Sequence, residues 1–132
     1  MSFLNTDIKR RDELIFKDGF QFERYSCGGI RYFKDLTLDT LKSLKRENFL
    51  DASDAQNSSP TIQEFMEFMD EHPGFTAHGY AVIDSRSDYR VSIEGLEKDG
   101  DISRDDLVDF VDMNRWADKL NVSDNWLRCW YD

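Results

Sequence analysis

The stretch from Phe75 to Lys98 reads FTAHGYAVIDSRSDYRVSIEGLEK, and it decides the fold class of this chain. Two extended runs, Phe75 to Ile83 and Tyr89 to Leu96, flank a polar turn over residues 84–88. This pattern predicts an antiparallel hairpin. Apolar and polar residues alternate in the second run, so we expect one face of this strand to be buried and the other to be exposed to water.

Helix signals precede this hairpin. Thr37 can cap a helix that ends near Asn48, because leucines recur on one face of the segment between them. Residues 51–60 have the composition of a loop. Thr61 then begins a second helix, and its spacing to Glu64 is that of a capping box.

A third helix is predicted after the hairpin. Ser103 and Asp106 have the spacing of a second capping box, and the helix is expected to run to about Leu120. Asn114 interrupts its apolar stripe, so we expect the stripe to shift toward Val111 and Met113.

Other stretches read as strands. Residues 13–26 alternate around turn residues 17–19 and predict a second hairpin, and residues 30–33 resume as another strand. The tail, residues 125–132, alternates as well and favours a final strand. A short helix capped by Ser123 is the alternative for this tail.

The whole chain fits one domain. Its 132 residues match the usual domain size, and a hydrophobic content of 39% is enough for a core. Hairpins with separate helices predict an α+β fold. We expect a mostly antiparallel sheet of about five to six strands, with three helices packed on one face.

Charge is distributed unevenly along the chain. The net charge is −10, and residues 1–50 hold 10 basic and 8 acidic side chains, whereas residues 51–132 hold 7 and 19. Such an excess repels nucleic acid and anionic membranes and attracts basic proteins. We therefore expect no direct binding to nucleic acid or membranes. The alternative is that the acidic residues serve solubility alone.

The stretch from Glu94 to Asp112 holds eight acidic side chains and resembles a calcium loop at first sight. With Gly100 at the sixth position of an EF-hand, Gly95 falls at the first, where a carboxylate is needed. We therefore expect a turn, then a helix whose first turn favours acidic residues, and no metal site.

Catalytic patterns are absent from the sequence. It lacks the GxSxG, P-loop, HExxH and GxGxxG patterns, and its two histidines and two cysteines do not have the spacing of zinc ligands. Cys27 and Cys129 are interpreted as free thiols of a cytoplasmic protein, since no signal segment is evident. No cofactor is expected. A small hydrolase that uses His78 with a cysteine or carboxylate stays the least favoured hypothesis.

Two sets of residues carry the functional hypotheses. The first hypothesis is a non-enzymatic module that binds a basic protein surface, as an inhibitor or immunity protein of bacterial or phage type or a nucleic-acid mimic does. Its contact residues are predicted to be Glu97, Asp99, Asp101, Asp105, Asp109, Asp112, Trp126 and Trp130. The alternative is a small-ligand or metal-binding domain, with Thr76, His78 and Tyr80 as a polar pocket wall.

Overall fold

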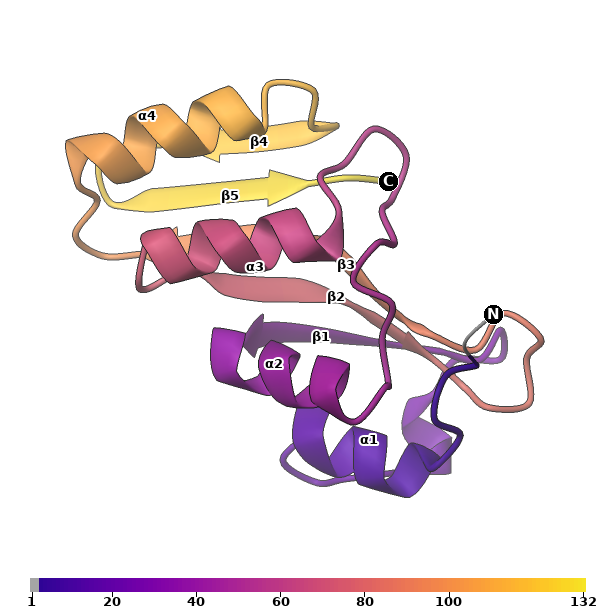
Figure 1. The fold of residues 1–132 in the computed structure, drawn as a ribbon. Helices are drawn as coiled ribbons and strands as arrows, with labels where there is room; N and C mark the ends of the chain where they lie inside the picture. Colours follow the sequence, from indigo (N-terminus) through magenta and orange to yellow (C-terminus); the bar gives the residue numbers. More distant parts are fainter. Residues whose placement is uncertain (1–2) are drawn as a thin grey trace.

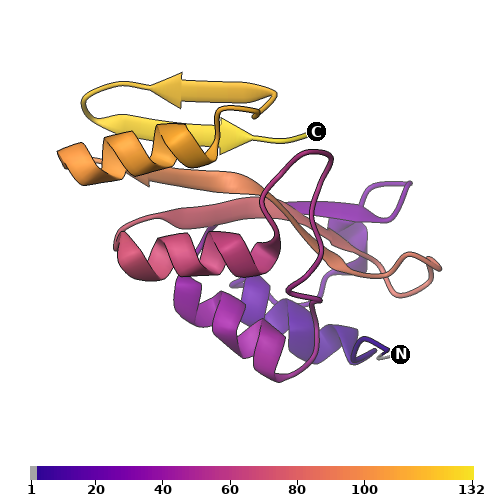
Figure 2. The ribbon, with the colours of Figure 1, turned by 45° about the horizontal axis from the view of Figure 1, so that its top comes forward.

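The fold is one layer of helices over one face of a single sheet (Figures 1 and 2). A computed structural model describes residues 3–132 of the chain. In chain order the elements are α1 (Ile8–Ile15), the 3-10 helix η1 (Phe22–Arg24), β1 (Ile30–Leu36), α2 (Leu38–Arg46), α3 (Ile62–Glu71), β2 (Thr76–Val82), β3 (Val91–Asp99), α4 (Arg104–Met113), β4 (Lys119–Val122) and β5 (Trp126–Trp130). The predicted α+β class is confirmed, with four α-helices over residues 3–132 in place of three.

The sheet is antiparallel throughout, in the order β1-β2-β3-β5-β4. The central pair β2–β3 is the predicted hairpin, and β5 is the predicted final strand. A register shift falls between His78 and Gly79, where β3 bulges. Next to this bulge, a Cβ added to Gly95 would lie 2.0 Å from the carbonyl oxygen of Cys129. Strands β3 and β5 therefore approach closely because Gly95 has no side chain.

The hydrophobic core lies between the sheet and the helix layer. Leu41 and Leu44 of α2, Phe65 of α3 and Phe110 of α4 are fully buried. Burial of each such side chain contributes roughly 1.5–3 kcal/mol. The ring of Phe65 meets that of Tyr131 edge-on, with 6.3 Å between the ring centroids. The chain end after β5 is thereby part of the core.

Side chains cap the helices where the sequence predicts caps. Thr37 caps α2, and Thr61 and Glu64 form the full capping box of α3. The Ser103 hydroxyl accepts a hydrogen bond from the Asp106 amide at 3.0 Å. The carboxylate of Asp106 does not complete that second box, because it contacts other residues described below.

The predicted hairpin over residues 13–26 is wrong. Helix α1 occupies Ile8–Ile15, and η1 follows it. The buried stripe of α1 contains Arg11 and Asp12. These two side chains form an ion pair at 2.9 Å, and both contact the Tyr25 hydroxyl. The helical period was hidden because charged residues stand where apolar ones are expected. Their burial is tolerated because each charge is paired and hydrogen-bonded.

The helix predicted to reach Leu120 is shorter in the structure, where α4 ends at Met113 and strand β4 follows. Asn114 is fully buried, and the predicted shift of the stripe does not occur. Its side-chain amide donates to the Phe110 carbonyl at 2.9 Å and accepts from the Tyr131 hydroxyl at 2.8 Å. These bonds satisfy a polar side chain inside the core and hold the helix end against the chain terminus.

Candidate functional site

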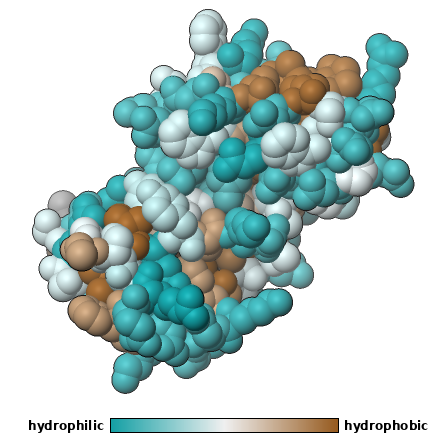
Figure 3. Space-filling model, turned by 180° about the vertical axis from the view of Figure 1, so that it is seen from behind, coloured by the Kyte–Doolittle hydropathy of each residue, from teal (hydrophilic) through white to brown (hydrophobic). Residues whose placement is uncertain are grey.

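The face of the sheet away from the helix layer is called the outer face here (Figures 1 and 2). Figure 3 views the molecule from this side and shows hydrophilic side chains mixed with pale ones of intermediate hydropathy and with smaller hydrophobic areas. Tyr32 and Tyr80 lie opposite each other on β1 and β2, with their ring centroids 6.0 Å apart. Tyr32 is 71% exposed. The outer face is therefore rich in the residue types that protein interfaces favour.

The three residues of the predicted polar row, Thr76, His78 and Tyr80, all lie on the outer face of β2. His78 is buried, and its Nε2 donates to the carbonyl oxygen of Cys129 at 2.8 Å. Burial lowers the pKa of the His78 imidazole, so the ring is neutral at pH 7. The Tyr80 hydroxyl accepts a hydrogen bond from Arg90 at 2.8 Å. Bonds within the chain thus already occupy both side chains.

The Cys129 thiol points away from this row, into the core. Its sulfur accepts a hydrogen bond from the Leu96 amide at 3.3 Å, and burial raises the pKa of the thiol to about 12. His78 therefore meets the backbone of Cys129 and not its sulfur. Cys27 is exposed, and neither cysteine forms a disulfide. The hydrolase hypothesis finds no thiol–imidazole pair at Cys129.

The predicted contact set divides between two sides of the sheet. Glu97, Asp99, Trp126 and Trp130 lie on the outer face, as the registers of β5 with β3 and with β4 show. Asp101 follows in the link to α4. The remaining members, Asp105, Asp109 and Asp112, lie on α4 within the helix layer.

One part of the set is continuous. Strand β3 ends where α4 begins, at the same end of the sheet (Figure 1). Glu97, Asp99, Asp101 and Asp105 follow this path around the end of the sheet, and we call them the acidic end. Asp99, Asp101 and Asp105 are exposed, and none of them forms an ion pair within residues 3–132. Their negative charge is therefore directed into solvent.

Asp106 differs from its exposed neighbours. Its carboxylate accepts hydrogen bonds from Lys98 at 2.6 Å and from His72 Nδ1 at 2.9 Å. Burial alone would raise the pKa of the Asp106 carboxyl, but the bonds from Lys98 and His72 outweigh burial and lower it. The other ring nitrogen of His72 lies 3.1 Å from Asp109. This cluster joins α3, β3 and α4, and its long-range contacts have no local sequence signal.

Apolar side chains lie beside the acidic end. Val108 on α4 is 52% exposed and Val122 on β4 is 48% exposed. An exposed apolar patch with a charged rim is typical of a protein–protein interaction site.

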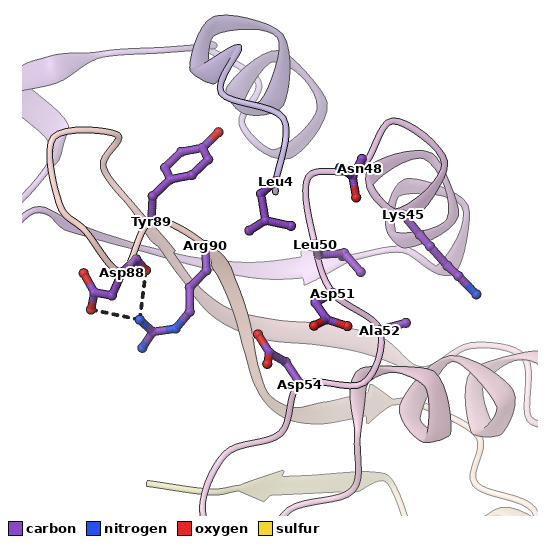
Figure 4. Close-up of a pocket in the computed structure, with 10 residues that line it drawn as sticks. All are labelled: Leu4, Lys45, Asn48, Leu50, Asp51, Ala52, Asp54, Asp88, Tyr89 and Arg90. Atoms are coloured by element: carbon purple, nitrogen blue, oxygen red, sulfur yellow. Dashed lines mark hydrogen bonds and ion pairs between the residues drawn. The ribbon is translucent and has the colours of Figure 1, made fainter. Parts of the chain in front are cut away.

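A hollow of about 780 Å³ lies at the other end of the sheet, between the α2–α3 loop and the β2–β3 turn (Figure 4). Leu4 and Leu50 provide apolar walls, and Asp54 and Arg90 line it as well. Arg90 is already held by Asp88 at 2.9 Å. The sequence offered no signal for this hollow because three distant segments form it.

The ligand-binding alternative has no matching hollow. Five surface hollows of about 410 to 780 Å³ are described over residues 3–132, and Thr76, His78 and Tyr80 line none of these five. Within the same residues, no group of three or more His, Cys, Asp or Glu side chains is arranged to hold a metal ion. The role of Thr76, His78 and Tyr80 as the wall of a ligand pocket therefore stays a prediction.

Comparison of the chain with protein-family models, with curated proteins and with solved structures finds no match. Over residues 3–132, no helix has the length and apolar character needed to cross a membrane.

Proposed function

We propose that this protein is a non-enzymatic protein-binding module whose acidic end and α4 bind a basic protein surface. The observation that carries the proposal is the run of exposed, unpaired carboxylates Asp99, Asp101 and Asp105, which have no ion-pair partner within residues 3–132. The exposed Val108 and Val122 beside them supply apolar contact area. Carboxylates around an apolar centre match the usual anatomy of an interface.

The mechanism that we propose is competition for an electropositive groove. The net charge of −10 attracts a basic partner from a distance, and the acidic end then fills the groove that another ligand of the partner would occupy. This is how an inhibitor, an immunity-type protein or a nucleic-acid mimic acts. Because the contact charges are exposed, salt is expected to weaken the complex strongly, with a screening length of about 8 Å at physiological ionic strength.

The test is recovery of a partner from the native host with variants as matched baits. Asp105→Lys, Asp109→Lys and Asp112→Lys together should abolish recovery of a basic protein that wild-type bait binds at low salt and releases at high salt. Circular dichroism should show that the triple variant is folded.

The matched control places the same change of charge at the other end of the molecule. Glu13→Lys, Glu23→Lys and Asp39→Lys alter exposed residues of the first 50. This variant should keep the partner with an affinity within about threefold of wild type, since distant surface charges contribute little. If both triple variants lose the partner to the same extent, net charge alone holds the partner on the bait, and a defined binding site is refuted.

A further inference from the structure

Cations already lie over two aromatic rings of the outer face. The Arg90 guanidinium lies 5.4 Å from the centroid of the Tyr80 ring, and the Lys119 ammonium lies 5.7 Å from that of Trp130. Both distances fall within the range of cation–π attraction, which is about 6 Å. The chemistry of the outer face therefore suits positively charged side chains.

Trp126 is the exception among these rings. None of the cations of residues 3–132 lies over its indole. Its Nε1 donates a hydrogen bond to the Glu97 carboxylate at 2.6 Å, which fixes the orientation of the ring. Asp99 lies directly opposite Trp126 in the β3–β5 register. Directly opposed residues have their Cβ atoms about 4.5–5.5 Å apart, so a second carboxylate lies beside the indole.

Carboxylates and an aromatic ring together form the usual recognition site for an arginine or lysine side chain. The carboxylates accept charge-assisted hydrogen bonds, and the face of the ring attracts the cation. Arginine fits best, because its planar group can stack on the indole and bond a carboxylate with two N–H groups. Trp126 is half-buried, so its position is fixed while part of the ring stays accessible.

We infer that Trp126, Glu97 and Asp99 form an anchoring site for an arginine side chain of the partner. The inference rests on the proposed function, because it names the residue type by which the basic partner is held. The site lies on the outer-face side of the acidic end, where β3 ends and β5 begins (Figure 1). The carboxylates of α4 then extend the contact around the end of the sheet.

Arg128 is a competitor within the chain. It lies opposite Glu97 in the β3–β5 register, yet it forms no ion pair within 4.0 Å among residues 3–132. Its guanidinium therefore weakens the site by repulsion without filling it. Removal of this charge should strengthen binding of an external arginine.

The probe that tests the site is a tetra-arginine peptide, followed by NMR of the three tryptophan indole N–H signals. The peptide should shift the Trp126 signal more than the Trp116 signal.

The variants test which carboxylates hold the peptide. Glu97→Gln with Asp99→Asn keeps the side-chain shapes and should weaken peptide binding about tenfold, or about 1.4 kcal/mol. Glu13→Gln with Glu23→Gln removes the same charge from exposed residues of the first 50 and should weaken it no more than about twofold. Arg128→Gln should strengthen binding about twofold to threefold.

Several results would overturn the inference. These are equal losses in the two double variants, a Trp126 signal that does not move, or weaker binding by Arg128→Gln. A larger Trp126 shift with a single-stranded oligonucleotide than with the peptide would assign the ring to base stacking instead. The proposed function is tested separately, by the α4 reversal and the host partner. The two proposals can fail separately. If Glu97→Gln with Asp99→Asn loses the peptide but the α4 variant still binds the host partner, the arginine site is supported and the role of α4 is refuted.

Discussion

Residues 3–50 and residues 61–132 build the same two layers by different means. In the first region the fully buried Arg11 and Asp12 form an ion pair inside the packing of α1. In the second region aromatic rings pack beneath α4, such as Phe75 stacked on Phe110 with 5.1 Å between the ring centroids. The packing of α1 depends on each of these two charges finding its partner, whereas the aromatic packing beside α4 depends on shape and apolar area.

The sharpest way to break this comparison is Arg11→Met. It leaves the buried Asp12 carboxylate without its cation, so the free energy of unfolding should fall by about 3–5 kcal/mol in urea titrations. Arg11→Met with Asp12→Leu and Tyr25→Phe removes both charges and the hydroxyl that they contact, and it should recover most of that loss. If the single variant loses less than about 1 kcal/mol, the buried pair does not hold the first region together.

Asp106 provides the next largest effect, and it depends on pH. Its pKa is lower in the folded protein than the usual value near 3.9, so its contribution is present above that pH and is lost as pH falls through the folded value. Asp106→Asn should cost about 1.5–3 kcal/mol at pH 7, because bonds to a charged group are lost. Urea titrations from pH 2 to 6 should show a shallower acid slope for the variant. An unchanged slope would contradict the assignment.

A smaller effect is expected at the end of α4. Tyr131→Phe leaves the buried Asn114 oxygen without its donor and should cost about 1–2 kcal/mol by thermal or urea unfolding. Tyr32→Phe changes an exposed hydroxyl on the outer face and should stay within about 0.5 kcal/mol. Equal costs for the two tyrosines would mean that the Asn114 contact adds no stability.

The smallest difference is predicted for the helix caps, where the two regions are alike. Thr37→Ala on α2 and Thr61→Ala on α3 should each lower the free energy of unfolding by about 1 kcal/mol. Thr→Ser at either site keeps the hydroxyl and should recover most of the loss. If only one of the two Thr→Ala variants lowers the free energy of unfolding, the contribution of a cap depends on the region around it and not on the cap alone.

The same contrast explains which elements can be predicted from the sequence. The β2–β3 hairpin, α2, α3 and β5 follow from local patterns, because apolar residues repeat at the strand or helix period. The first segment is polar and compatible with a helix, but no apolar stripe marks the bounds of α1, since Arg11 and Asp12 occupy two of its buried positions and their partner Tyr25 is distant in sequence. The end of α4 depends likewise on a bond from Tyr131 to Asn114.

The candidate site was predictable in composition but not in arrangement. The acidic residues and Trp126 were identified from charge and residue type. Their division between the outer face and α4 follows from the β3–β5 register, which no local pattern specifies. The burial of Asp106 beside exposed acidic neighbours depends on its bonds to His72 and Lys98, which come from other elements.

The opposite environments of the two cysteines give the molecule a built-in reporter. A maleimide reagent should attach to the exposed Cys27 alone in the native protein, because the Cys129 thiol is buried and keeps its proton. Cys129 becomes reactive when β5 separates from β3. The rate of this second modification therefore measures how often the strand that carries Trp126 opens, and a bound partner at that strand should slow it.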